Sequence, residues 1–510
     1  MTLLTILPIL IPLLTAVFML LAWQRIDRQR WLSLGGAGGL LIVGLLLVGA
    51  VDTGDVLAVQ IGNWPAPFGI TLVADLLSAI MLVLIGLIGL AVTVYGLASV
   101  DAERQADGYY PLVQVLLMAL AGAVLTGDLF NLFVWFEVML IASFVLLALG
   151  GGRGQIEGAF KYMALNLFAS SLFLAAVGIL YGVAGTLNMA DLALRFAAGV
   201  VAPGLMSVLA MLFLVALGIK AALFPLFFWL PASYHTAPPV ISALFAGLLT
   251  KVAVYVLIRL FTLLFVHDTG YTHTLLLWLA GFTMVTGVLG AAAQNEIRRI
   301  LSFHIVSQIG YMIMGLAILT PLALTGAIFF VMHNIIVKTN LFLIGGVVQR
   351  IQRTEQLNKL GGLYSAWPGL TMLFLISALA LAGLPPFSGF WAKLLLVQAG
   401  LAAEAWIIVG VSLFVSILTL YSMTKIWNEA FWKRPADESF APERGEPMSP
   451  STAWLLFSPI VVLALLTVSI GVIVEPLLQL TGAAAAQLLA PTAYIEAVLG
   501  ANTLSVARSN

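Results

Sequence analysis

Cysteine is absent from the 510-residue sequence, which excludes disulfides, thiol catalysis and iron–sulfur clusters held by cysteine. Charged residues are scarce, at 9%, and their formal charges sum to zero, so no excess of positive charge indicates nucleic acid as a partner. The five histidines are scattered and form no metal motif, and no nucleotide-binding fingerprint occurs. We therefore expect no bound metal and no cofactor.

Hydrophobic residues make up 62% of the chain, which is typical of an integral membrane protein. Apolar runs of about 20 residues are long enough to cross a bilayer as helices. The first run lacks a basic leader and a small-residue cleavage site, so we interpret it as a retained helix. The sequence predicts an all-α membrane protein with about 14 transmembrane helices. The predicted spans are 3–23, 31–50, 71–98, 110–126, 129–149, 162–184, 203–231, 238–262, 274–293, 300–319, 322–347, 369–400, 406–428 and 452–478.

Basic residues gather in alternate loops between these spans. The loops that follow odd-numbered spans hold most of them, for example Arg25, Arg104, Arg298 and Lys433, whereas the other loops hold little beyond Arg195. The positive-inside rule then places the arginine-rich loops in the cytoplasm and both termini outside.

Two of the predicted spans contain both a lysine and a proline break. In the seventh span, Lys220 lies too deep for its side chain to reach the membrane surface, and Pro225 follows five residues later. In the twelfth span, Pro385 and Pro386 precede Lys393. Broken helices are tolerated in membranes where the freed backbone groups face protein or a water-filled cavity, so a lysine beside a break indicates an ion path. The alternative is a lysine paired silently in the core of the bundle.

The two broken spans lie five spans apart, so they run in opposite directions. This pattern predicts two inverted five-helix repeats with broken helices 7 and 12, and the alternative is a chance pairing of two kinked helices. The predicted divisions are 1–109 (helices 1–3), 110–262 (first repeat, helices 4–8), 274–428 (second repeat, helices 9–13), 452–478 (helix 14) and 479–510 (C-terminal tail).

Further ionisable residues lie deep in other spans. Glu137 is either a neutral acid bonded to a carbonyl group or a partner of Lys220 in the same half of the chain. His333 precedes Lys338 by five residues and is either a member of the same cavity or a satisfied core histidine. We expect His304 near the cytoplasmic end of its span and Arg259 at the outer interface. The candidate proton-pathway residues are Glu137, Lys220, Lys251, His333, Lys338 and Lys393.

Packing alone does not require so many buried charges. Each costs on the order of 2.5–3.5 kcal/mol at the centre of a membrane helix. Desolvation weakens the hold of a lysine on its proton, and a nearby carboxylate restores it. A row of lysines bridged by water could therefore relay protons. The sequence leaves open a structural scaffold with inert buried charges.

Several motifs around these residues resemble those of a known family. VWFEVM, GIKAALFPLFFWLP, LLTKVAVY, HNIIVKTNLF and GLPPFSGFWAK are together similar to the antiporter-like subunits shared by complex I, membrane-bound hydrogenases and Mrp sodium/proton antiporters. The stretch GNWPAPFGITLVADLLSAIM at 62–81 is typical of the D branch of the Mrp group. One departure is that many relatives carry a histidine four residues before Lys338, where this chain has Asn334.

The resemblance implies fourteen helices with a discontinuous seventh and twelfth helix. It also implies a hetero-oligomer with other Mrp subunits among the lipids of a plasma membrane, the inner membrane if the source is bacterial. The implied activity is Na⁺ extrusion driven by inward H⁺ flow, without a redox cofactor. The alternative within the family is a proton-pumping module of complex I or of a membrane-bound hydrogenase.

Overall fold

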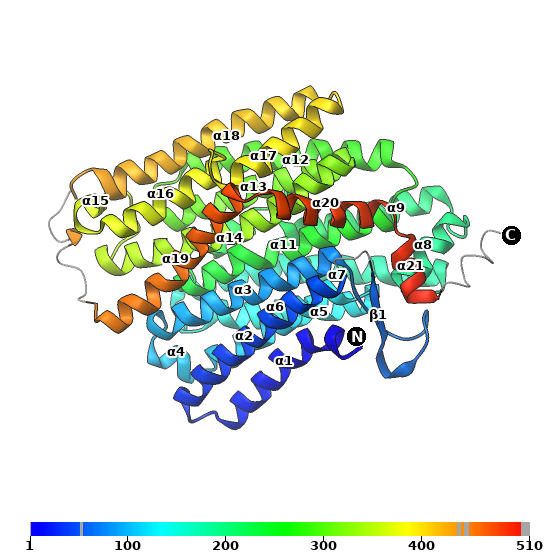
Figure 1. Cartoon of the computed structure of the whole chain (residues 1–510), viewed down its shortest axis with the longest axis horizontal. Helices are drawn as coiled ribbons and strands as arrows, with labels where there is room; N and C mark the ends of the chain where they lie inside the picture. The colour runs from blue at the N-terminus through cyan, green and yellow to red at the C-terminus, as the bar shows by residue number, and fades with distance from the viewer. Residues whose placement is uncertain (1, 52–54, 436–439, 443–447, 501–510) are drawn as a thin grey trace.

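The computed structural model describes residues 2–51, 55–435, 440–442 and 448–500. Figure 1 shows an elongated helical bundle with a small β-hairpin near one end. Its first helices are α1 (Thr2–Leu21), α2 (Ile26–Val51), α3 (Leu76–Ser99), α4 (Ala102–Ala106), α5 (Tyr109–Leu125), α6 (Leu129–Ala148), α7 (Arg153–Ala184), α8 (Met189–Ala197), α9 (Pro203–Ala221), α10 (Trp229–Ser233) and α11 (Pro239–Leu263). The later helices are α12 (Thr269–Ala293), α13 (Ile297–Ile318), α14 (Pro321–Gln352), α15 (Leu363–Ala366), α16 (Pro368–Ala382), α17 (Ser388–Ala402), α18 (Trp406–Ile426), α19 (Pro450–Val472), α20 (Glu475–Leu489) and α21 (Thr492–Leu499).

The hairpin corrects the predicted start of the third span. Strand β1 (Leu57–Gln60) pairs antiparallel with β2 (Thr71–Ala74), so the residues from 71 to 74 are a buried strand and not the first turn of a helix. Asp75 separates the two elements, because its carboxylate accepts a hydrogen bond from the backbone N–H of Ser78 at 2.9 Å and caps α3.

The number of spans differs from the predicted fourteen. Among the described residues, 12 helices are long and apolar enough to cross a membrane. The predicted spans 110–126 and 369–400 contain shorter helices, because α5 has 17 residues and the latter span is split in two. The predicted tail from 479 includes most of α20 and all of α21, which meet at a bend of 69°. Counting that pair as one span gives 13, so the count of fourteen is not confirmed.

The predicted breaks in the seventh and twelfth spans are confirmed. Helix α9 ends where Ala222 adopts a left-handed conformation (φ 61°), and only the short α10 follows before α11 begins. Helix α16 ends at Gly383, also left-handed (φ 91°), and α17 starts five residues later. The inverted relation between the two halves stays a prediction.

Three helices form the centre of the bundle. Helix α11 is buried at every residue from Val240 to Leu263, and α13 and α14, which pack on it, are buried along most of their length. Helices α2 and α12 instead expose more than half of their most apolar stretch. A helix that is hydrophobic all round and enclosed by others is a core helix, so the polar residues of α11, α13 and α14 lie away from lipid.

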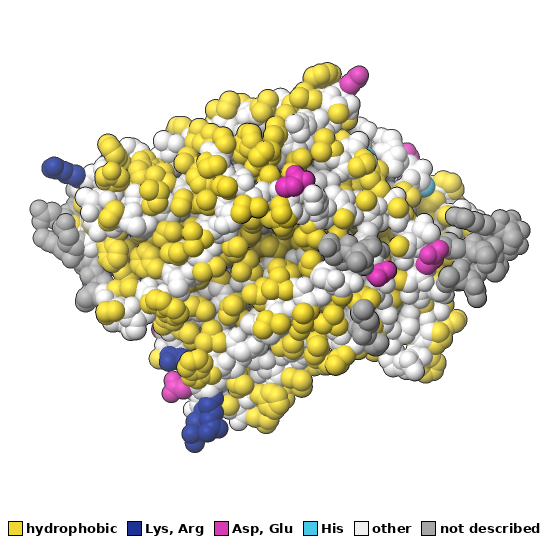
Figure 2. All heavy atoms as spheres, in the orientation of Figure 1, with side chains coloured by type: hydrophobic (Ala, Val, Ile, Leu, Met, Phe, Trp, Pro, Cys, Tyr) yellow, Lys and Arg dark blue, Asp and Glu magenta, His cyan; other side chains and the backbone are white. Residues whose placement is uncertain are grey.

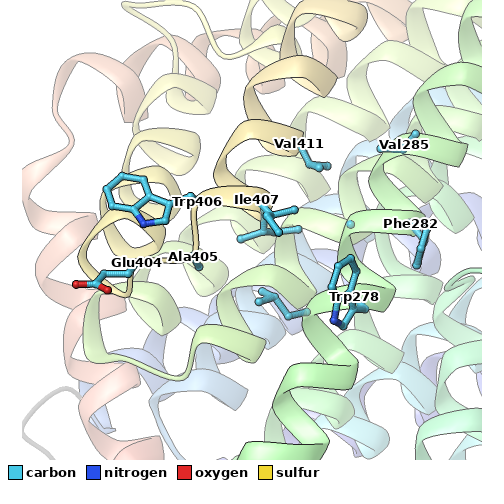
Figure 3. A pocket seen from close by; sticks show the side chains of 11 residues that line it. Trp278, Phe282, Val285, Glu404, Ala405, Trp406, Ile407 and Val411 are labelled. Atoms are coloured by element: carbon cyan, nitrogen blue, oxygen red, sulfur yellow. The ribbon is translucent and has the colours of Figure 1, made fainter.

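The molecular surface fits a membrane environment. Figure 2 shows a face covered mainly by hydrophobic side chains, with the visible Lys and Arg side chains toward its left end. Helices α12 and α18 also border an apolar surface cavity of about 400 Å³ (Figure 3). The carboxylate of Glu404, at its rim, points away from Trp278 and Phe282.

Candidate ion path

The structure buries all four predicted lysines on different helices. Lys251 on α11 and Lys338 on α14 are completely enclosed, and Lys220 on α9 and Lys393 on α17 are exposed by 5% and 7%. His333 is also buried, one helical turn from Lys338, whereas Glu137 on α6 is only half-buried. In the described part of the chain, none of these lysines forms an ion pair with a carboxylate.

Lys220 binds a hydroxyl group instead of the predicted Glu137. Its ammonium group donates a hydrogen bond to Ser170 Oγ at 2.9 Å and lies 5.0 Å from the centre of the Phe136 ring. Glu137 is the next residue along α6, and its buried Oε1 has no hydrogen-bond partner among the described residues. The two predicted partners therefore belong to one neighbourhood without direct contact.

The two central lysines bind backbone carbonyls. Lys251 donates to the carbonyl oxygen of Ala246 at 2.6 Å, within its own helix. Lys338 makes a long contact of 3.4 Å with the carbonyl oxygen of Leu301 on α13. A carbonyl oxygen can accept a hydrogen bond from an ammonium group or, more weakly, from a neutral amine, so either protonation state fits these positions.

Lys393 closes the break in the twelfth span. It donates to the carbonyl oxygen of Ala382, the last residue of α16, at 2.8 Å, and it lies 5.1 Å from the centre of the Tyr311 ring. A Cβ atom on Gly383 would come within 2.6 Å of this lysine side chain, so the close approach requires glycine. His333 is hydrogen-bonded through Nδ1 to Ser388 Oγ at 2.8 Å, at the start of α17.

One face of α13 connects Lys338 with Lys393, and of its polar residues the sequence analysis considered only His304. Leu301, His304, Gln308 and Tyr311 recur at helical spacing, with Leu301 touching Lys338 and Tyr311 facing Lys393. We call His304, Gln308 and Tyr311 the α13 stripe. The signal was three polar residues at intervals of four and three within an apolar span.

Polar atoms on this stripe and on the neighbouring α14 lack partners among the described residues. Both side-chain amide atoms of Gln308 and of Asn334 are buried without a hydrogen bond, as are Nδ1 of His304 and Nε2 of His333. His304 Nε2 does contact Ser422 Oγ, at 2.6 Å. Buried polar groups are normally satisfied by protein or by ordered water, so this cluster can hold water molecules.

Two arginines lie at opposite ends of the bundle, and both are paired. Arg259, expected at the outer interface, is buried at the end of α11 and binds Asp75 at 2.5 Å. Arg298, at the start of α13, binds Glu355 at 2.5 Å and donates to the carbonyl oxygen of Ala237. Glu355 lies in the loop after α14, where burial raises its pKa to about 7 although Arg298 opposes the shift.

The chain offers little to a metal ion. Within the parts of the chain that the structure describes, no cluster of three or more His, Asp or Glu side chains has the geometry to hold one. The lysine amines and the imidazoles of His304 and His333, groups that can each take up and release a proton, are buried in the bundle.

Comparison with known proteins places the chain in a family. The family model for the transmembrane part of NADH:quinone oxidoreductase and Mrp antiporter subunits matches residues 126–419. The D-type Na(+)/H(+) antiporter subunit of Alkalihalophilus pseudofirmus is 47% identical over 496 residues, which cover 97% of this chain and 99% of that protein. The chain belongs to the NADH:quinone oxidoreductase/Mrp antiporter family. Within this family it groups with the D-type members.

Solved structures of family members share the fold. A chain of the Mrp complex from Dietzia sp. DQ12-45-1b is 34% identical and superposes with a TM-score of 0.91, over 98% of this chain and all of that one. A chain of the membrane-bound sulfane sulfur reductase, an archaeal respiratory membrane complex, is 26% identical and superposes with a TM-score of 0.89 over the same shares.

Proposed function

We propose that this chain is a proton- or cation-translocating subunit of an electrogenic multisubunit Na⁺/H⁺ antiporter in a plasma membrane, the inner membrane of a bacterium. Other Mrp-type subunits would be its partners. One observation carries the proposal: four buried lysines have no carboxylate partner among the described residues and are held by hydroxyl or carbonyl oxygens.

The second half would contain the continuous part of the relay. Protons would move between Lys338 and Lys393 along the α13 stripe, with water bound to the unpartnered atoms of Gln308 and Asn334. Lys251, on the neighbouring α11, would connect this segment to the first half, because α11 packs against both α9 and α14. Protonation of one lysine repels a proton on the next, so each transfer favours onward movement.

Glu137 and Lys220 would act as a switch at the other end of the relay. Bound to Ser170, Lys220 has no carboxylate in contact among the described residues, and in this state it would pass its proton to the relay. A small movement toward Glu137 would form an ion pair and retain the proton. This pairing would be a second conformation, distinct from the one in which Lys220 binds Ser170.

Sodium would cross in a partner subunit or at a border with one. The transmembrane helices contribute one partly buried carboxylate near the relay, Glu137, and hard cations need several oxygen ligands. Lysines along the remaining path would repel a cation. This chain would therefore supply the proton limb of the exchange.

A redox-driven pump module is the second candidate. The family model covers NADH:quinone oxidoreductase subunits as well, and the reductase chain shares the fold over nearly the full length. The same relay could then move protons when a neighbouring subunit is reduced. The absence of cysteine means that a cysteine-held electron carrier would have to lie in that neighbour.

Reconstitution separates the two candidates. The native complex and the isolated chain are placed in liposomes with a pH-sensitive dye inside, and NaCl is added. We expect exchange by the complex without NADH or quinone, and none by the isolated chain. Exchange that strictly requires NADH would move the chain to the redox-driven class, and robust exchange by the chain alone would contradict a sodium path shared with a partner.

A further inference from the structure

The groove between α1 and α2 contains two adjoining cavities of different chemistry. One, of about 700 Å³, lies at the turn between the helices, and the other, of about 520 Å³, runs along them toward the middle of the membrane. Arg28 and Leu32 line both, so the two cavities adjoin at these residues. Figure 1 shows α1 and α2 side by side at the edge of the bundle.

The cavity at the turn presents two uncommitted positive charges. Arg25 and Arg28 are exposed, and neither side chain has a partner among the residues that the structure describes. Arg30, two residues later, is instead bound to Gln105 and Asp27. The positive-inside rule places this turn on the cytoplasmic side, where the negative potential of anionic lipids is strongest.

The second cavity is apolar, and glycine forms part of its floor. A Cβ atom on Gly36 would come within 2.6 Å of Thr15, so the two helices approach closely there. A Cβ atom on Gly35 would meet nothing within 4 Å, so the groove is open above it. Trp31, which is 75% exposed, borders the groove near Arg28. Tryptophan is enriched at this depth of a membrane.

We propose that the α1–α2 groove binds one anionic phospholipid of the cytoplasmic leaflet. Arg25 and Arg28 hold the phosphate group, and an acyl chain lies over Gly35 between the helices. Gly35 is seven residues beyond Arg28, or roughly 10 Å along a helix, which is the direction and depth that an acyl chain takes below its headgroup. A free phosphate ion would bind the two arginines only and would leave the adjoining apolar cavity empty.

Photolabelling of the assembled complex tests this site. The complex is reconstituted in phosphatidylcholine vesicles in two preparations. One contains a trace of phosphatidylglycerol with a diazirine on one acyl chain, and the other contains a trace of phosphatidylcholine that carries the same group. Labelled peptides are then mapped by mass spectrometry. We expect phosphatidylglycerol to label the segment around Gly35 more strongly than phosphatidylcholine. Each change of Arg25 or Arg28 to Gln should lower the labelling about fivefold, and Lys at these positions should restore most of it.

A matched pair of glycine variants separates the groove from general contact with lipid. Gly35→Leu places a side chain in the cavity at a position where a Cβ atom meets nothing within 4 Å, and it should abolish the labelling. Gly49→Leu, on the same helix and equally free of neighbours, should leave it unchanged. Equal labelling by the two lipids, unchanged labelling in Gly35→Leu, or full protection by millimolar glycerol 3-phosphate would each overturn the proposal.

Discussion

Buried basic residues have different partners at the ends of the bundle and in its middle. At the ends, Arg259 binds Asp75 and Arg298 binds Glu355, and each pair joins segments that are far apart in the sequence. In the middle, Lys251 and Lys338 are fully buried, and among the described residues their hydrogen bonds go only to backbone carbonyl oxygens. An arginine keeps its proton under all conditions, whereas a lysine can lose it. The arginine pairs therefore fit a structural role, and the lysines between them fit the proton transfer proposed above.

The largest expected effect comes from breaking an arginine pair. Arg259→Ala leaves the Asp75 carboxylate buried without its partner, which should cost about 3–5 kcal/mol and prevent assembly of a stable complex. The measurement is the yield and melting temperature of the purified complex. The double variant Arg259→Met with Asp75→Asn should recover much of the loss, because Asn still caps α3. A stable single variant would contradict a structural role for the pair.

Replacing a relay lysine should remove transport without affecting stability. Lys393→Ala should lower Na⁺-driven pH change in vesicles by at least about tenfold, because it removes the amine that would carry the proton at the break. Lys393→Glu should keep part of the activity, since a carboxyl group also exchanges protons. The melting temperature of both complexes should stay near that of the native one. Full activity of Lys393→Ala would rule out this role.

A smaller effect is expected from the α13 stripe. Gln308→Leu keeps the volume but removes the amide that would hold water, so transport should fall several-fold. The melting temperature should stay equal or rise, because an unsatisfied polar group is lost. Thr467→Val on α19 is the control, since it also removes a buried polar group, but on a helix that is not part of the proposed relay. Native transport in Gln308→Leu would show that the stripe plays no part.

A last expected effect is a pH dependence of stability at the Arg298 end, without loss of transport. Burial raises the pKa of Glu355 from 4.5 to about 7, so the folded state binds its proton more tightly than the unfolded state. The resulting stabilisation is complete below about pH 4.5 and is lost as the pH rises to about 7, on the order of 1–3 kcal/mol in all. Melting temperatures between pH 5 and 8 should show this slope in the native complex and lose it in Glu355→Gln. If melting temperature changed with pH in the same way in both complexes, the raised pKa of Glu355 would be contradicted.

The sequence predicted the elements with local signals. Apolar runs marked the long helices, and proline beside lysine marked both breaks. It missed the hairpin, because the strand residues 71–74 continue into the apolar run of α3 and only Asp75 separates them. It missed the pairing of Arg259, because the partner lies 184 residues away and no local pattern relates the two.

Side-chain partners within the site were also beyond the sequence. The sequence predicted a pair of Lys220 and Glu137 because their charges are opposite and both lie in the first half of the chain. In the structure Lys220 binds the hydroxyl group of Ser170 instead. The sequence analysis did not single out Gln308, which lies on the face of α13 between the contacts with Lys338 and Lys393. Such contacts depend on how helices rotate against one another, which periodicity does not determine.

The most direct measurement compares ion transport after replacing Lys338, in the middle of the bundle, with transport after replacing the Arg298–Glu355 pair at its end. Complexes with Lys338→Ala, and complexes with Arg298→Met combined with Glu355→Leu, are reconstituted at equal amounts, and NaCl-driven pH change is recorded by dye fluorescence. The Lys338 variant should be stable and inactive. The double variant replaces a buried ion pair with apolar side chains, so it should fold and keep most of its transport. Active Lys338→Ala vesicles beside an inactive, folded double variant would contradict the assignment of proton transfer to the lysines.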